Sequence, residues 1–182
     1  MKVINTRLDQ CFVIEPTIYE DHRGYFVETF NHKQFLAQTG MDINFVQDNE
    51  SYSTYGVLRG IHFQHGAYAQ AKLVRVTEGE VLDVAVDLRK NTSTFGQYFT
   101  IKLSDKNKKQ LFIPRGFGHG FVVLSKYARF LYKCDNYYNK TAECGILYND
   151  RDLGIDWNIP DQDLKISEKD LQWPNLKTTL RL

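Results

Sequence analysis

Short runs of alternating apolar and polar side chains, separated by turns rich in Gly, Asn or Lys, follow one another through the middle of the chain. Such alternation is typical of β-strands with one buried face, because successive side chains of a strand point to opposite sides. Many short strands at this spacing indicate a sandwich or a barrel. The runs are residues 72–88, 99–104, 109–114, 119–125 and 128–138.

The first of these runs, residues 72–88, predicts a β-hairpin, because two alternating stretches flank a turn-like segment at Thr77–Glu80. The second arm of this hairpin has two unlike faces. One face carries Asp83 and Asp87. The other face is apolar and consists of Leu82, Val84, Val86 and Leu88.

Helix signals are few. Residues 31–40 predict a short helix with Asn31 as its N-cap and Gly40 as its stop, and the tail near residues 167–172 predicts another. Because strands dominate, we expect a mainly β fold: an antiparallel jelly-roll, cupin-like barrel with a few short helices, mostly N-terminal and C-terminal.

The length of 182 residues suits one domain with a sizeable core. No internal repeat, low-complexity stretch or Pro- or Ser-rich linker divides the chain. We therefore expect a single domain over residues 1–182. Its jelly-roll core should span about residues 45–140, and a C-terminal tail of about residues 150–182 should close the binding site.

The charge balance argues against a polyanionic partner. Lys and Arg total 23 against 22 for Asp and Glu, and the formal net charge is +1. Without a basic stripe, nucleic acid and a membrane surface are excluded as main partners. The longest apolar runs are too short to span a bilayer.

The compartment is expected to be the cytoplasm, because the N-terminus lacks the apolar core of a signal peptide. The three cysteines, Cys11, Cys134 and Cys144, form no Cys-x-x-Cys pair, and we expect them to be reduced thiols.

Four polar side chains interrupt strand faces that are otherwise apolar: His62, Lys72, His119 and Tyr132. A barrel of this class can hold one small ligand in its mouth, and inward polar groups there must pair with each other or with a ligand. Each residue alone could equally be a packed side chain, and the pattern leaves both explanations open. Their companions by strand parity are Leu58, Gly60 and Gln64 for His62, Val74 and Val76 for Lys72, Phe117, Phe121 and Val123 for His119, and Ala128, Phe130 and Cys134 for Tyr132.

A metal site is not expected. A metal-binding cupin would show a His-x-His pair and a nearby Glu on one face, whereas His62 and His65 have opposite parity. Ligands on opposite faces of one strand cannot close one coordination sphere at about 2.0–2.2 Å. The sequence also lacks a Gly-x-Ser-x-Gly elbow and a Gly-rich phosphate loop, so metal-free acid–base catalysis remains.

Nine segments, in register over about residues 3 to 175, resemble the dTDP-4-dehydrorhamnose 3,5-epimerase family. They are DHRGYFVETF, FVQDN, VLRGIHFQ, AKLVRV, GEVLDVAVDLRKNTSTFGQ, IPRGFGHGFVVLS, FLYKCDNYY, LYNDRDLGIDW and ISEKD.

This resemblance implies epimerisation at C3 and C5 of dTDP-4-dehydro-6-deoxy-D-glucose, without a cofactor, in dTDP-L-rhamnose biosynthesis. It implies His62 as the base and Tyr132 as the acid that returns a proton from the opposite face. It further implies that Lys72 lies near the developing C4 oxyanion and that Asp170 pairs with His62 and raises its basicity.

Asp170 also has a purely structural explanation. Residues 167–170, Ser-Glu-Lys-Asp, fit the capping-box pattern, and the sequence alone favours that cap over a catalytic role. The resemblance reverses this preference.

Substrate-holding residues carry over from the family motifs. The guanidinium of Arg59 is expected to suit a diphosphate, but strand parity points it away from His62 unless Gly60 allows a bulge. The implied set is Arg23, Glu28, Gln47, Asn49, Arg59, Lys72, His119, Tyr138, Glu143 and Lys169.

The resemblance also implies a homodimer with exchanged N-terminal strands, in which Arg23 could serve the neighbouring subunit's site. Two alternatives stay open. One is a C3-only or C5-only epimerase or a 3,4-ketoisomerase on a related nucleotide keto-sugar. The other is a non-catalytic sugar-nucleotide-binding barrel, against which the intact set of acid–base residues argues.

Overall fold

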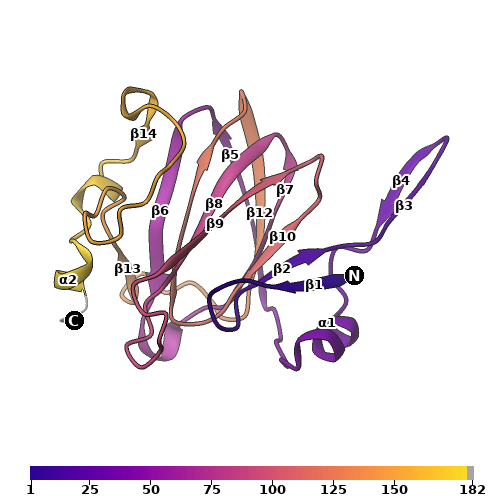
Figure 1. Cartoon of the computed structure of the whole chain (residues 1–182), viewed down its shortest axis with the longest axis horizontal. Coiled ribbons are helices and arrows are strands. Elements are labelled where there is room, and N and C mark those ends of the chain that lie inside the picture. Colours follow the sequence, from indigo (N-terminus) through magenta and orange to yellow (C-terminus); the bar gives the residue numbers. More distant parts are fainter. Residues whose placement is uncertain (180–182) are drawn as a thin grey trace.

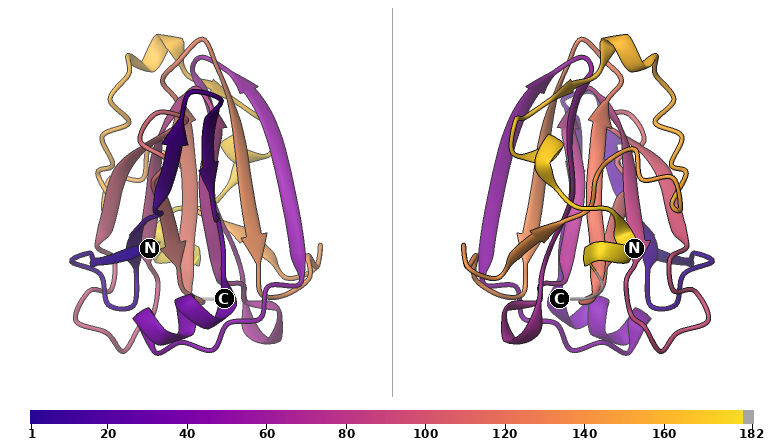
Figure 2. Two further views of the ribbon diagram at one scale, coloured as in Figure 1. Left: turned by 90° about the vertical axis from the view of Figure 1, so that its right-hand side faces the viewer. Right: turned by 90° about the vertical axis from the view of Figure 1, so that its left-hand side faces the viewer.

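The structure is a computed structural model that describes residues 1–179, and it confirms the mainly β, jelly-roll fold. Two antiparallel sheets face each other (Figures 1 and 2). The first has the order β1-β2-β10-β7-β12-β5 and consists of Lys2–Asn5, Phe12–Glu15, Gln110–Ile113, Lys72–Glu78, Tyr127–Cys134 and Gln47–Thr54. The second has the order β13-β6-β11-β8-β9 and consists of Glu143–Gly145, Val57–Gln64, Phe117–Val123, Glu80–Asp87 and Tyr98–Ser104, with β14 (Lys165–Ile166) beside β6.

The barrel begins earlier than the core of residues 45–140 expected from the sequence. Strands β1 and β2 pair with each other, and β2 continues the first sheet by pairing with β10. A separate two-stranded sheet, β3 (Ile18–Asp21) and β4 (Gly24–Val27), extends from the body as an arm (Figure 1).

The predicted hairpin over residues 72–88 is wrong. Strand β7 pairs with β10 and β12 in the first sheet, whereas β8 pairs with β11 and β9 in the second. The chain therefore crosses from one sheet to the other at residue 79. Alternation identifies a strand and its buried face, but it does not say whether the next strand is the partner.

Two apolar clusters position the sheets. The inner cluster fills the space between them and includes Val74, Ala85 and Phe130. The outer cluster joins the far face of the second sheet to the C-terminal tail, through contacts such as those of Trp157 and Leu176. The apolar face predicted for β8 (Leu82, Val84, Val86 and Leu88) belongs to this outer cluster, so Asp83 points toward the barrel interior.

The helix predicted at residues 31–40 is confirmed as α1 (His32–Thr39). The Asn31 side chain accepts a hydrogen bond from the Gln34 N–H, and Gly40 ends the helix in the left-handed conformation. Where the tail helix was predicted, near residues 167–172, the structure has only a 3-10 turn at Asp170–Gln172, and a short helix, α2 (Leu176–Thr179), follows it. Other 3-10 turns lie at Gly66–Tyr68 and Asp161–Asp163.

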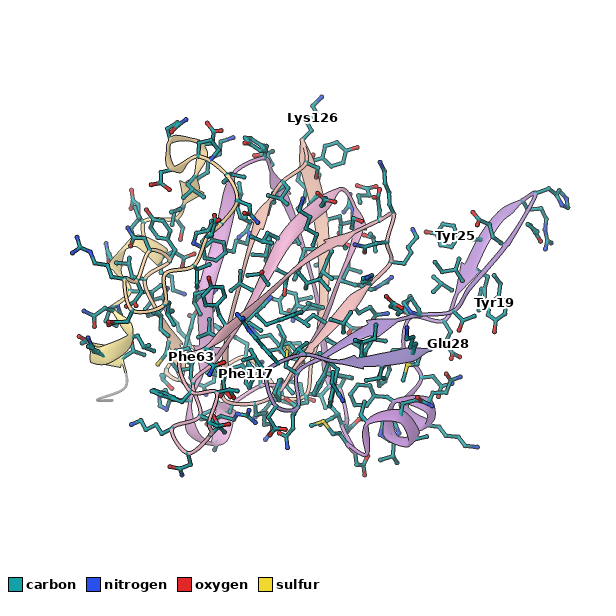
Figure 3. All side chains as sticks on the ribbon, viewed as in Figure 1. Tyr19, Tyr25, Glu28, Phe63, Phe117 and Lys126 are labelled. Atoms are coloured by element: carbon teal, nitrogen blue, oxygen red, sulfur yellow. The ribbon has the colours of Figure 1, made fainter. Side chains whose placement is uncertain are left out.

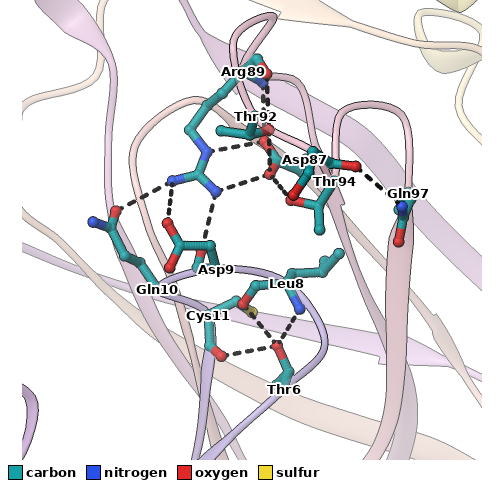
Figure 4. Close-up of polar contacts among 11 residues, drawn as sticks. Thr6, Leu8, Asp9, Gln10, Cys11, Asp87, Arg89, Thr92, Thr94 and Gln97 are labelled. Carbon is teal, nitrogen blue, oxygen red and sulfur yellow. Dashed lines mark hydrogen bonds and ion pairs between the residues drawn. The ribbon is translucent and has the colours of Figure 1, made fainter.

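The DLRKNTSTFGQ stretch fastens the N-terminal loop to the barrel (Figure 4). The Arg89 guanidinium donates to both oxygens of Asp87 and to the backbone oxygen of Asp9. Burial of the Asp87 carboxyl opposes its ionisation, but hydrogen bonds from Arg89 and Thr94 lower its pKa below the usual value. This network is structural, because its donors are already engaged within the chain.

Among residues 1–179, no helix is long and apolar enough to cross a membrane.

Candidate active site

A bulge in β6 decides which side chains of that strand face the barrel interior. His62 is paired with His119, but Arg59 is paired with Phe121, so three steps along β6 match two along β11. Gly60 sits in this irregularity with φ of +135°, and a Cβ there would lie 2.5 Å from the Cα of Gly120. Only glycine fits this position.

Because of this bulge, the inward and outward faces predicted for β6 are wrong for Leu58 and Arg59. Leu58 does not share a face with His62 but packs in the outer cluster with Ile61. Arg59 instead points inward, and its Nε donates to Ser53 Oγ at 3.1 Å. The bulge that the sequence required for Arg59 to reach the site is therefore present.

A cavity of about 280 Å³ lies between the two sheets. His62 lines it from the second sheet, whereas Lys72 and Tyr132 line it from the first. The structure thus brings the predicted base and acid to opposite walls. The full lining is Gln47, Asn49, His62, Phe63, Gln64, Gln70, Lys72, Tyr132, Cys134, Tyr138 and Glu143.

The imidazole of His62 is held from behind by Asp170. His62 Nε2 lies 2.7 Å from Asp170 Oδ1, and the side chain of Asp170 is almost fully buried whereas that of His62 is 30% exposed. Burial alone would raise the pKa of Asp170, but hydrogen bonding to His62 holds it below its usual value. A carboxylate here fixes the Nε2–H tautomer and leaves Nδ1 with a lone pair.

The capping box expected at residues 167–170 is only half formed. Ser167 Oγ accepts a hydrogen bond from the Asp170 N–H at 3.1 Å, while the Asp170 carboxylate faces His62.

Lys72 and Tyr132 lie near each other on the wall opposite His62, on the neighbouring strands β7 and β12. The Lys72 ammonium lies 5.9 Å from the centre of the Tyr132 ring. Burial lowers the pKa of Lys72, because desolvation disfavours its ammonium form, and raises the pKa of Tyr132, because desolvation favours the neutral phenol. Among residues 1–179, no carboxylate forms an ion pair with Lys72, which leaves this ammonium available to an incoming anion.

A second histidine–aspartate pair lies inside the barrel. His119 Nε2 lies 3.0 Å from Asp83 Oδ2, and both side chains are buried. Burial lowers the pKa of His119. His119 is the direct strand neighbour of His62 but does not line the cavity itself.

The mouth of the cavity is crossed by a polar chain. Tyr138 Oη donates to Glu143 at 2.8 Å, and Lys169 Nζ lies 2.5 Å from the same carboxylate. Burial would raise the pKa of Glu143, but hydrogen bonds from Lys169 and Tyr138 lower it. Beside them, Gln47 donates to Asn49 Oδ1 and accepts from the Tyr138 N–H, so both amides are oriented before a ligand arrives.

Six of the predicted site residues do not line this cavity: Arg59, His119, Lys169, Asp170, Arg23 and Glu28. The last two belong to the β3–β4 arm and its base. Arg23 is at the tip of the β3–β4 arm, where it pairs with Asp21 at 2.6 Å. Glu28, at the base of the arm in Figure 3, accepts hydrogen bonds from Asn31 and Gln34.

Comparisons with known proteins agree on one family. The family model for dTDP-4-dehydrorhamnose 3,5-epimerase matches residues 5–178. The epimerase of that name from Shigella flexneri is 50% identical over 171 residues, covering 94% of this chain and 93% of the relative. This chain belongs to the dTDP-4-dehydrorhamnose 3,5-epimerase family.

Solved structures of the family superimpose closely. The epimerase from Elizabethkingia anophelis NUHP1 has a TM-score of 0.95 and 56% identity, covering 98% of this chain and 97% of that one. A 3,5-epimerase from Legionella pneumophila Philadelphia 1, in complex with dTDP-4-keto-L-rhamnose, has a TM-score of 0.93 and 48% identity, covering 97% and 93%. The cupin-like fold and the epimerase assignment made from the sequence are confirmed.

Several features of this epimerase-family site were missed from the sequence. Asp83 was assigned to a strand face but not to the site, although a carboxylate on a strand otherwise made of buried residues was a usable signal. Gln64 shares the cavity and holds the loop around residues 137–139 through two hydrogen bonds, and its amide N–H also donates to the Tyr68 oxygen. Trp173, which donates to Asp170, had no signal in the sequence.

No cluster of three or more His, Cys, Asp or Glu side chains that could hold a metal ion occurs within residues 1–179. The three cysteines are free thiols. The Cys134 thiol lines the cavity, and burial raises its pKa to about 11.

Proposed function

We propose that this epimerase-family chain inverts C3 and C5 of dTDP-4-dehydro-6-deoxy-D-glucose by proton transfer between two walls of one cavity. The carbons on either side of a ketone can lose a proton at neutral pH only when the resulting enolate is stabilised. Removal from one face and return from the other inverts the carbon. The observation that carries the proposal is the placement of His62 and Tyr132 on opposite sheets, with Lys72 beside the tyrosine.

His62 is the base in this proposal. Its Nε2–H is directed at Asp170, so the lone pair of Nδ1 accepts the substrate proton. The buried Asp170 carboxylate then stabilises the imidazolium that forms.

Tyr132 is the acid and Lys72 the oxyanion donor. Burial raises the pKa of Tyr132, which keeps its transferable proton in place at neutral pH. The desolvated Lys72 ammonium gains a counter-charge only when the C4 oxygen becomes negative, so it stabilises the enolate more than the ketone.

The nucleotide part of the substrate is assigned to the end of this cavity lined by Gln47 and Asn49. The oriented amides of Gln47 and Asn49 offer donors and acceptors suited to a planar base. Arg59, exposed along the inward face of β6, suits the diphosphate. Lys169 would also contact such a phosphate, while its ammonium stays paired with the Glu143 carboxylate.

We further propose that the chain works as a homodimer and that the β3–β4 arm enters the partner's site. Two strands alone are marginally stable in water, and this arm exposes Tyr19 and Phe26 to 63% and 67%. If these rings were buried against a second copy of the chain, Arg23 at the tip of the arm would lie near the cavity of that second copy. Residues Arg23 and Glu28 would then complete a site they do not reach in their own chain.

Substitution of the base tests the catalytic part. His62→Asn is expected to fold normally. Its turnover of the keto-sugar nucleotide should fall by about 10²–10⁴-fold, which is the usual contribution of a general base. His65→Asn is the matched control, because His65 is exposed and does not line the cavity. Turnover of His62→Asn equal to that of the control would refute the assignment.

Mixing inactive variants tests the shared site. Hybrid dimers of Arg23→Ala and His62→Asn contain one site with both residues intact, so activity should return on mixing. Hybrids of His62→Asn with Tyr132→Phe are the control, because both residues line the same subunit's cavity and no intact site can form. Failure of the first mixture to regain activity, with hybrid formation verified, would contradict a composite site.

A further inference from the structure

The indole of Trp173 lies directly behind the base that we assign to His62, on which the following inference rests. Its Nε1–H donates to Asp170 Oδ1 at 3.2 Å. This is the same oxygen that lies 2.7 Å from His62 Nε2. The indole and imidazole rings are 6.2 Å apart, edge to face.

We propose that Trp173 is a positioning residue for the base: its indole N–H fixes the Asp170 carboxylate against His62 and draws off part of the negative charge that holds the His62 proton. The other oxygen of Asp170 accepts only a long hydrogen bond, 3.4 Å, from the Gly60 N–H. Orientation of the carboxylate therefore depends mainly on the two donors to Oδ1.

The packing around Trp173 holds the indole in place. A Cβ on Gly145 would lie 2.4–2.5 Å from atoms of the indole, so the ring rests directly on the backbone of β13. The Lys169 ammonium, which is paired with Glu143, lies 5.5 Å from the centre of the indole ring. The Leu147 N–H also donates to the Pro174 oxygen at 3.0 Å, which fixes the chain next to the indole.

The direction in which Trp173 changes the proton affinity of His62 follows because the indole N–H and the His62 N–H share one oxygen, Asp170 Oδ1. A donor that stabilises the carboxylate charge weakens the pull of that carboxylate on the proton of His62. Loss of the indole N–H should therefore make His62 hold its proton more tightly. The other ionisable groups around His62 lie on β7, β8, β11, β12, β13 and the tail, and the substitution leaves them unchanged. They are Lys72, Asp83, His119, Tyr132, Glu143 and Lys169.

Trp173→Phe tests this role, since it keeps a ring on Gly145 but removes the N–H. Trp157→Phe is the matched control, because the Trp157 indole donates to the Tyr148 oxygen in the outer cluster, away from the cavity. The readout is the titration midpoint of the His62 imidazole protons by NMR in the free enzyme, with His62→Asn assigning the signal. Trp173→Phe should raise this midpoint, because the carboxylate keeps more of its negative charge, and Trp157→Phe should leave it unchanged.

Activity gives a second readout. The acid limb of kcat/KM should move to higher pH by the same amount in Trp173→Phe, because a smaller fraction of the base is free at each pH. Gly145→Ala, which crowds the ring while the indole remains, should shift the midpoint in the same direction. A midpoint in Trp173→Phe that is unchanged or lowered would overturn the proposal. The NMR titration needs no turnover, so this failure is distinct from a failure of the proposed epimerisation.

Discussion

Replacing Tyr132 by Phe separates its role as an acid from its role in packing. The phenol ring packs against the inner cluster, with its centre 6.1 Å from that of Phe130, and the variant keeps this ring. Among residues 1–179, no hydrogen bond to the Tyr132 hydroxyl is found, so its removal leaves no buried partner unsatisfied. The free energy of unfolding should therefore change by less than about 1 kcal/mol.

Inversion, in contrast, should fall by about 10²–10⁴-fold, which corresponds to about 3–5 kcal/mol of transition-state stabilisation. Proton abstraction by His62 does not need the phenol, and Lys72 can still hold the enolate. The variant should therefore continue to exchange substrate hydrogen for deuterium, because His62 returns the label to the face from which it took the proton.

The assay is the ratio of deuterium exchange to epimerised product, measured by NMR in heavy water. This ratio should rise sharply in Tyr132→Phe. An unchanged ratio would mean that Tyr132 is not the acid, and Tyr138, which also lines the cavity, would be the next candidate.

Three further outcomes are expected. Activity should survive exhaustive treatment with EDTA, and a loss that added divalent ions restore would contradict metal-free catalysis. Gly60→Ala should lower the free energy of unfolding by about 2–3 kcal/mol in urea denaturation, because a Cβ would lie 2.5 Å from the Gly120 backbone at φ of +135°; wild-type stability would contradict the tight bulge. Because burial lowers the pKa of His119 from 6.5, the unfolded chain takes up a proton that the folded chain does not, and stability should fall as pH drops below 6.5. His119→Gln should show a shallower fall, and an equal slope would contradict a neutral buried imidazole.

Local signals in the sequence predicted the ends of α1 and the inner face of two strands correctly, but not the hairpin over residues 72–88. Asn31 and Gly40 marked the ends of α1 because capping depends on residues next to each other in the chain. Parity placed Lys72 and Tyr132 on the inner face because β7 and β12 are regular at those positions.

Parity failed where the backbone is irregular or the contact is distant. The extra residue at Gly60 reverses the side that Leu58 and Arg59 face, and alternation cannot reveal such a bulge in advance. The local cap at Ser167 formed as the sequence suggested, but the use of the Asp170 carboxylate depends on His62, more than a hundred positions away in the chain.

Family motifs pointed to residues that spacing could not identify, namely Asp170, which contacts His62, and Arg59, which lies on the inward face of β6. Nothing in spacing or motif pointed to Trp173, since its hydrogen bond exists only once the tail has folded against β13.

The most direct test of the two-wall mechanism is incubation of dTDP-4-dehydro-6-deoxy-D-glucose with the protein in heavy water, followed by NMR of the product sugar. Acid–base inversion on both sides of the ketone predicts one solvent deuterium at C3 and one at C5, both with inverted configuration. Inversion without solvent deuterium at these carbons, or label and inversion at only one of them, would contradict the 3,5-epimerisation described above.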